Sequence, residues 1–155
     1  MISSRDIEAN GFEWSYANTI PSLRIGKPII VNTDLDGGPG IHWITLVKLA
    51  NGVTYIYDPL GARNQRVSSD GTRTTDTITK GKRVVFYPYA SQRASTTRCG
   101  WFALYVANLI RKFMRANPVS AMRKLSAIDI TNMIKERFGK SADKKDEEVL
   151  ASGFI

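Results

Sequence analysis

Asn51 and Gly52 constrain the fold more than any other part of the chain, because they separate two β-rich runs. The runs cover residues 42–49 and 53–58. An Asn-Gly pair favours a tight hairpin turn, since both residue types adopt the left-handed backbone conformation that such turns require. We therefore predict two antiparallel neighbouring strands, with His42 at the start of one beside Asp58 at the end of the other.

The other periodic segments indicate further strands and several helices. Short apolar runs predict strands at residues 28–32 and 83–87. Helices are expected from Ser3 or Ser4 to Gly11, over residues 100–116, from Pro118 onward, and from Ser126 to Gly139. The first and last of these begin with the Ser-x-x-Asp spacing of a capping box, and proline suits the first turn of a helix.

Two polar stretches are expected to be irregular, namely residues 12–28 and residues 61–83. In the first stretch we expect Trp14, Tyr16 and Pro21 to pack over the core. Together these patterns predict a single α+β domain over residues 1–155, with a mostly antiparallel sheet flanked by helices. Residues 140–155 are expected to form a frayed tail.

The counts of cysteine and histidine exclude several kinds of site. The chain of 155 residues holds one cysteine, Cys99, and one histidine, His42. A lone cysteine forms no internal disulfide, and a structural zinc ion needs four Cys or His ligands. The sequence also lacks a phosphate-binding glycine motif, an apolar run of membrane-spanning length and a signal peptide. We therefore expect an intracellular protein that needs no cofactor and does not bind membranes.

The net charge of +8 is concentrated in two segments. Residues 63–98 carry eight Lys or Arg against two acids, and residues 111–124 carry five against none. We expect the second segment to face outward and to bind DNA through its phosphates, without sequence preference. Its basic residues are Arg111, Lys112, Arg115, Arg123 and Lys124. A surface that only keeps the protein soluble is the competing interpretation.

Cys99 stands at the predicted start of a helix, where the helix dipole and free N–H groups favour a thiolate. Gly100 lets a substrate carbonyl approach the backbone, and the Cys99 N–H is placed to bind an oxyanion. The competing interpretation is a buried and inert cysteine.

Three other residues supply the remaining parts of thiol chemistry. His42 can take the thiol proton and return it to a leaving amine, while Asp58 fixes the imidazole tautomer and stabilises the imidazolium. The side-chain amide of Gln92 can donate to an oxyanion. Each residue also has an ordinary interpretation: a core histidine bonded to the backbone, an Asp-Pro turn and a solvated loop glutamine.

The order of these residues resembles that of a known family of proteases. His42-Trp43, then Asp58, Gln92 and Cys99-Gly100 follow the pattern of adenovirus-type (adenain) maturation proteases and the related ubiquitin-like-protein proteases. The resemblance covers roughly residues 29–115 and looks closest to proteases of virophages and Polinton-type elements. Asp58 matches the ubiquitin-like branch, whereas the adenovirus proteases have Glu at this place.

The resemblance implies a circularly permuted papain-like fold with the catalytic cysteine at the start of a core helix. It implies a cysteine endopeptidase in which Cys99 is the nucleophile, His42 the base and then acid, and Asp58 the orienting carboxylate. Gln92 and the Cys99 N–H would form the oxyanion hole. Trp43 would wall a narrow slot beside Gly100 that admits glycine or another small residue.

The same resemblance implies that the substrates are viral capsid or core precursors, cleaved in the host cell and in the virion. It further implies a monomer, with DNA or a peptide as an activator. Three alternatives stay open: a deconjugating protease for a ubiquitin-like modifier, an acyltransferase, and a non-enzymatic basic protein that packages nucleic acid.

Overall fold

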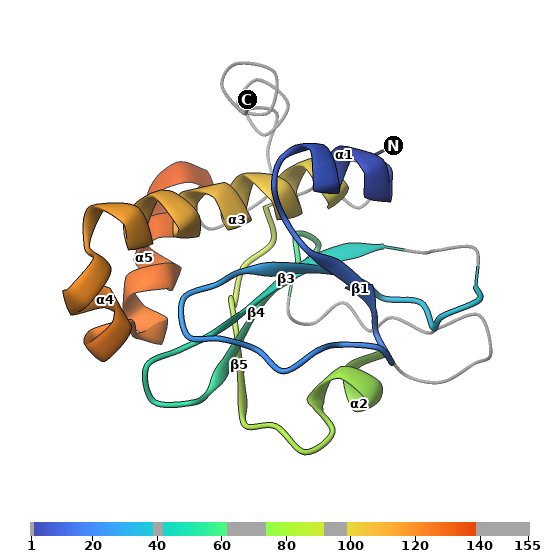
Figure 1. Ribbon diagram of the computed structural model, residues 1–155, viewed down its shortest axis with the longest axis horizontal. Helices are drawn as coiled ribbons and strands as arrows, with labels where there is room; N and C mark the ends of the chain where they lie inside the picture. Colours follow the sequence, from blue (N-terminus) through green and yellow to red (C-terminus); the bar gives the residue numbers. More distant parts are fainter. Residues whose placement is uncertain (1, 39–41, 62–73, 92–98, 139–155) are drawn as a thin grey trace.

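A five-stranded sheet lies at the centre of the computed structural model, in the order β1-β2-β3-β4-β5 (Figure 1). The structure describes residues 2–38, 42–61, 74–91 and 99–138. The strands are β1 (Trp14–Tyr16), β2 (Ile29–Asn32), β3 (Trp43–Lys48), β4 (Thr54–Tyr57) and β5 (Val84–Phe86). The inner pairs β2–β3 and β3–β4 are antiparallel, and the outer pairs β1–β2 and β4–β5 are parallel. The α+β class is confirmed, but the sheet is mixed instead of mostly antiparallel.

The predicted hairpin between β3 and β4 is present. Gly52 has a φ of 84°, its N–H donates to the Leu49 carbonyl, and the Asn51 side chain accepts from the Val53 N–H. The register pairs Thr45 with Tyr57, so Asp58 lies just beyond the last paired residue of β4. The turn chemistry therefore places the two strands as the sequence predicts.

The two parallel strand pairs explain why the sheet is mixed. Each is joined by a long connection, which is what parallel neighbours require. β1 lies within residues 12–28, where we expected no regular structure, and Pro21 is exposed there instead of packing over the core. The second connection contains helix α2 (Thr74–Thr79), and Ile78 of this helix is buried in the core beneath the sheet.

Two of the remaining helices begin where their capping boxes predict. In α1 (Ser4–Ala9) the Ser3 and Asp6 side chains form a capping box, and the same bonds join Ser126 and Asp129 at α5 (Ala127–Phe138). Between them lie α3 (Cys99–Ala116) and α4 (Pro118–Lys124). Gly139 and the predicted tail lie outside the described residues.

Helix α3 crosses one face of the sheet and packs mainly against β3 (Figure 1). Its apolar residues share a core with Val47 of β3 and Tyr57 of β4, whereas the alternate residues of these strands face the opposite side. The buried Thr45 hydroxyl donates to the Ala103 carbonyl of α3 over 2.7 Å. This packing holds the start of α3 close to the start of β3.

Within the described residues, none of the helices combines the length and the apolar character needed to cross a bilayer.

Candidate active site

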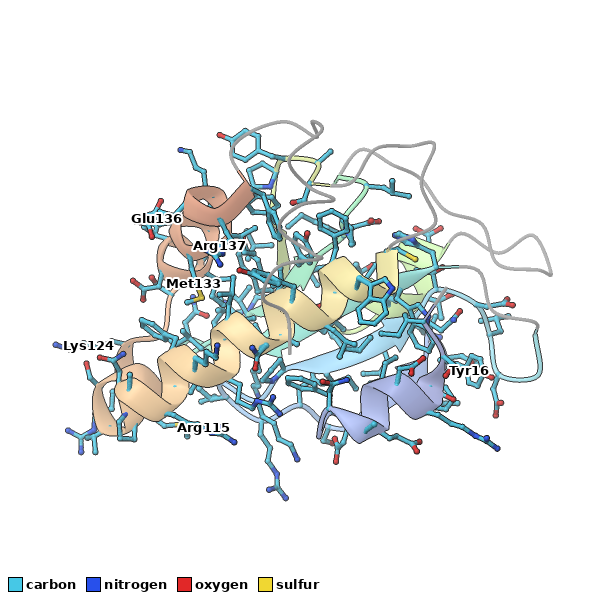
Figure 2. The ribbon with its side chains drawn as sticks, turned by 90° about the horizontal axis from the view of Figure 1, so that it is seen from above. Tyr16, Arg115, Lys124, Met133, Glu136 and Arg137 are labelled. Atoms are coloured by element: carbon cyan, nitrogen blue, oxygen red, sulfur yellow. The ribbon has the colours of Figure 1, made fainter. Side chains whose placement is uncertain are left out.

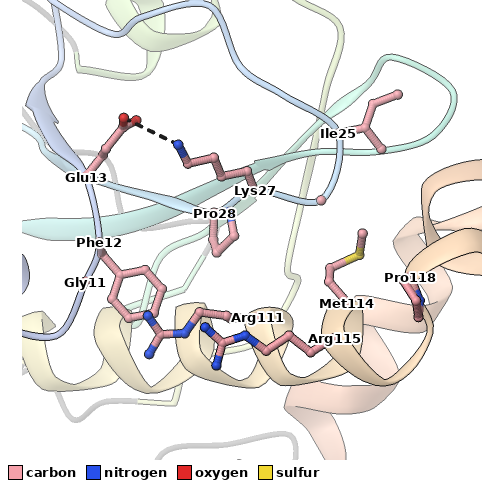
Figure 3. Close-up of a pocket in the computed structure, with 11 residues that line it drawn as sticks. Gly11, Phe12, Glu13, Ile25, Lys27, Pro28, Arg111, Met114, Arg115 and Pro118 are labelled. Carbon is pink, nitrogen blue, oxygen red and sulfur yellow. Dashed lines mark hydrogen bonds and ion pairs between the residues drawn. The ribbon is translucent and has the colours of Figure 1, made fainter.

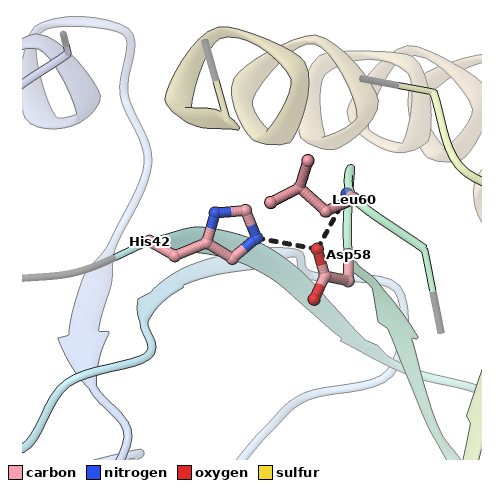
Figure 4. Close-up of polar contacts among 3 residues, drawn as sticks. All are labelled: His42, Asp58 and Leu60. Atoms are coloured by element: carbon pink, nitrogen blue, oxygen red, sulfur yellow. Dashed lines mark hydrogen bonds and ion pairs between the residues drawn. The ribbon is translucent and has the colours of Figure 1, made fainter. Parts of the chain in front are cut away.

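His42 and Asp58 form a buried, hydrogen-bonded pair at the ends of two neighbouring strands (Figure 4). The His42 Nε2 lies 2.7 Å from the Asp58 Oδ1, and the two residues are 3% and 8% exposed. The same oxygen accepts the Leu60 N–H at 2.9 Å, which makes Asp58 the first residue of a turn as well. Asp58 therefore both contacts His42 and begins an Asp-Pro turn, which are the two roles that the sequence suggested for it.

The pair forms diagonally instead of directly across the hairpin. Continuing the register beyond Tyr57 places Asp58 opposite Ile44, two residues after His42. Two residues placed diagonally across a strand pair lie on the same face of the sheet, and long side chains at these positions can reach each other. The Thr33 N–H also donates to the His42 carbonyl, which ties the start of β3 to the segment after β2. The proximity predicted from the turn is thus confirmed, with a register shifted by two residues.

Cys99 is the first residue of α3 and lies against His42. Burial by itself raises the pKa of the Cys99 thiol, since a thiolate is poorly solvated there. A hydrogen bond with the His42 side chain, its positive charge, and backbone hydrogen bonds at Trp43 and Gly100 act in the opposite direction. They prevail, so the pKa of Cys99 lies below its ordinary value.

The pKa of His42 is shifted the other way. Burial lowers it, but hydrogen bonds to Asp58 and Cys99 and the charges of both partners raise it above its ordinary value. Since Nε2 faces Asp58, the ring nitrogen left for Cys99 is Nδ1. A lowered thiol pKa beside a raised imidazole pKa favours a thiolate–imidazolium pair.

Trp43 and Gly100 lie next to this group but are covered by the N-terminal segment. Trp43 is 7% exposed, and its ring packs edge-to-face with that of Trp14, with the ring centres 5.8 Å apart. Its Nε1–H donates to the Ile2 carbonyl. A Cβ built on Gly100 would lie 1.5 Å from the Ile2 Cγ2. Gly100 is therefore needed for the packing of Ile2, and a substrate-contacting role for Trp43 or Gly100 stays a prediction.

Gly100→Ala is expected to destabilise the protein by about 1–3 kcal/mol, because the new methyl group overlaps a buried side chain. The measurement is the free energy of unfolding by urea. The Ile2→Ala change removes the clashing Cγ2, so the double variant should be more stable than the sum of the two single changes predicts. Strictly additive effects would show that Ile2 does not set the requirement for glycine.

Of the five basic residues, one is half-buried and four are exposed. Arg111 is half-buried: its guanidinium donates to the Asn10 carbonyl and to Asn108 and stacks over Phe12, with its carbon 4.0 Å from the ring centre. The prediction that Arg111 points outward is wrong, because these contacts anchor it between α1 and α3. Lys112, Arg115, Arg123 and Lys124 are exposed, and Figure 2 shows Arg115 and Lys124 at the periphery.

Gln92, the remaining candidate for the oxyanion hole, lies outside the described residues, so its role stays a prediction.

The sequence analysis did not predict the contact of Ile2 with Gly100, because no sequence signal reports a packing contact between residues so far apart.

Among the residues that the structure describes, no three His, Cys, Asp or Glu side chains gather in a way that holds a metal ion.

Comparison with known proteins adds no relative: no protein-family model and no curated protein sequence matches this chain.

Proposed function

We propose that this protein is a cysteine endopeptidase with Cys99 as its nucleophile. The observation that carries the proposal is the contact series from Cys99 to His42 to Asp58, at the junction of α3, β3 and β4. The chain has one thiol and one imidazole, and they contact each other with pKa values shifted toward the ion pair. A structural cysteine has no need of such an arrangement, whereas thiol catalysis depends on it.

The residues suffice for both halves of peptide hydrolysis. The Cys99 thiolate attacks the scissile carbonyl carbon, and the electron pair of the carbonyl moves onto oxygen. The His42 imidazolium then gives its Nδ1 proton to the leaving amine as the C–N bond breaks, leaving a thioester. Neutral His42 next takes a proton from water, whose oxygen attacks the thioester carbon. The C–S bond then breaks and the acid product leaves, which restores the Cys99 thiolate and the His42 imidazolium.

The oxyanion of these steps lies near the start of α3. The first N–H groups of a helix have no partner within the helix, so the Cys99 N–H is suited to receive the oxyanion. The family resemblance gives Gln92 a second donor role, which rests on its position in the sequence. Loss of one such donor lowers turnover by roughly 10²- to 10³-fold in other enzymes.

For substrates, we propose viral capsid or core precursors cleaved after glycine or another small residue. This part of the proposal rests on the resemblance of His42-Trp43, Asp58 and Cys99-Gly100 to the adenovirus-type proteases. An aspartate at position 58, in place of glutamate, matches the ubiquitin-like branch and keeps a deconjugating protease as the second candidate.

The experiment is a cleavage assay with the purified protein on a library of internally quenched peptides, varied at the residue on the acyl side of the cut. We expect cleavage, with a preference for glycine. A parallel assay with a ubiquitin-like modifier fused to a reporter separates the two candidates: cleavage of the folded fusion alone would favour the deconjugating protease. Failure to cleave either kind of substrate would contradict the proposed function.

Asp58→Asn is expected to lower kcat by roughly 10²- to 10⁴-fold with little change in KM. The asparagine Oδ1 can keep both hydrogen bonds, to His42 and to the Leu60 N–H, but it carries no negative charge. The imidazolium then loses its stabilisation, so the pKa of His42 falls. The checking measurement is the pH profile of kcat, whose alkaline limb should move to lower pH. An unchanged profile would remove Asp58 from the proposed mechanism.

A further inference from the structure

A second site of ligand size lies at the opposite end of α3 from Cys99 (Figure 3). This groove has a volume of about 550 Å³, which is within the range of ligand-binding pockets. Three segments form its walls: residues 11–13 after α1, residues 25–28 before β2, and the end of α3 with the first residue of α4. We call it the α3 groove.

The lining of the α3 groove combines apolar walls with paired cations. Phe12, Ile25, Pro28 and Met114 supply apolar surface, and the Arg111 and Arg115 side chains run side by side along one wall (Figure 3). The pKa of Arg111 is lowered by burial and by the positive charge of Arg115. Two like charges held together in this way are stabilised when an anion binds between them.

Within the described residues, no carboxylate of the protein forms an ion pair with Arg111 or Arg115. The ion pair at the groove joins Lys27 to Glu13 across 3.5 Å on the other wall, and Arg115 takes part in no ion pair in that part of the chain. Arg111 donates one hydrogen bond to Asn10 and one to Asn108, while its buried Nε has no hydrogen-bond partner among the described residues. The groove therefore matches a ligand with an apolar group next to a carboxylate.

We propose that the α3 groove binds an acidic segment of the protein substrate that carries a bulky apolar side chain. The proposal rests on the proposed endopeptidase function, since that activity brings polypeptide chains to this molecule. The apolar side chain lies against Phe12 and Met114, and an adjacent Asp or Glu carboxylate lies between the two guanidinium groups. Planar carboxylates suit this recognition because guanidinium groups bind them with paired hydrogen bonds.

The geometry of α3 sets the spacing of the two binding regions. Arg111 and Arg115 lie twelve and sixteen residues after Cys99 in one helix. At about 1.5 Å per residue, this separates the groove from the thiol by roughly 18–24 Å. An extended chain covers about 3.3 Å per residue, so the acidic segment must lie at least about six residues from the scissile bond.

Binding is tested on the Cys99→Ala variant, so that no cleavage takes place. The probe is a fluorescein-labelled peptide, Gly-Phe-Leu-Asp-Glu-Gly, and the measurement is fluorescence anisotropy. We expect saturable binding that weakens at least about tenfold when Asp and Glu in the peptide become Asn and Gln. Arg115→Glu should weaken binding to the same degree. Arg5→Glu makes the same charge change at an exposed site on α1 outside the groove, and should leave binding unchanged.

Two outcomes would overturn the proposal. Equal binding of the acidic and amide peptides would show that the groove does not recognise a carboxylate. Equal losses of peptide affinity in Arg115→Glu and Arg5→Glu would show that only the net charge of the protein matters. Equal displacement of the bound peptide from both variants by a short DNA duplex would lead to the same conclusion.

A cleavage assay separates failure of this proposal from failure of the proposed function. Substrates carry one cleavable sequence joined to the acidic segment by spacers of two, six or ten residues. For each spacer we compare kcat/KM of the acidic substrate with that of the substrate in which Asp and Glu are replaced by Asn and Gln. We expect this ratio to exceed one with spacers of six and ten residues but not with two. In Arg115→Glu we expect a ratio of one with every spacer. A ratio of one throughout, with cleavage present, would overturn the groove proposal and leave the endopeptidase intact. Peptide binding without any cleavage would overturn the endopeptidase proposal and leave the groove as a site for acidic peptides.

Discussion

Cys99→Ala is expected to lower peptide cleavage by roughly 10⁶-fold, because it removes the only thiol in the chain and with it thioester formation. The side chain is 5% exposed and lies at the start of α3, so a smaller apolar residue at this position keeps the helix intact. The measurement is kcat/KM on a cleaved peptide, with the thermal unfolding temperature as evidence of folding.

Tyr55→Phe is the matched control for this change. It removes the hydrogen bond between the Tyr55 hydroxyl and Thr131 of α5 without touching the thiol, the imidazole or α3. We expect a loss of stability of about 1 kcal/mol and retained cleavage. If Cys99→Ala remains folded and still cleaves, Cys99 is not the nucleophile.

His42→Gln is expected to lower cleavage almost as much as Cys99→Ala, since residues that act as a unit are strongly non-additive. Glutamine offers an amide N–H to the buried Asp58 carboxylate in place of the imidazole, so that Asp58 keeps a side-chain partner besides the Leu60 N–H. It has no group that takes up or releases a proton at neutral pH. The measurement is again kcat/KM, in the single variants and in the double variant with Cys99→Ala.

We expect the double variant to be no slower than the slower of the two single variants. Losses that multiply would indicate that His42 and Cys99 act independently, and would contradict a shared mechanism. His42→Gln that cleaves normally would assign His42 a structural role alone.

The parts of the fold predicted from the sequence are those with local chemistry. The hairpin follows from the backbone preferences of Asn51 and Gly52, and two helix starts follow from the side-chain bonds of Ser3 and Ser126. These signals act over four residues or fewer, and no distant contact overrides them here.

The errors concern features that depend on distant contacts. β1 has three residues, too few for alternation to be visible, and it exists because its backbone pairs with β2. Arg111 points inward because α1 offers the Asn10 carbonyl and the Phe12 ring, partners about a hundred positions earlier in the chain. Gly100 has a packing requirement that only the position of Ile2 reveals.

For the candidate site, the sequence predicted the group but not its exact register. Turn geometry brought His42 and Asp58 together, and the helix start at Cys99 followed from the change of hydrophobic period. That Cys99 also contacts His42 depends on how α3 packs on β3, through contacts such as Thr45 with Ala103. Local sequence patterns do not encode that packing.

The alkylation rate of Cys99 by iodoacetamide, measured against pH, tests the central claim most directly. Only the thiolate reacts, and the chain holds no second thiol that would contribute to the signal. Since the pKa of Cys99 is lowered and that of His42 is raised, the rate should rise at a lower pH than that of an ordinary thiol. In the urea-unfolded protein the rise should move to the ordinary thiol range near pH 8.5. In His42→Gln the thiol stays buried without the imidazolium, so the rise should lie in that range or at higher pH. If the folded native protein and His42→Gln give the same profile, with no reaction below that range, Cys99 and His42 do not form a thiolate–imidazolium pair.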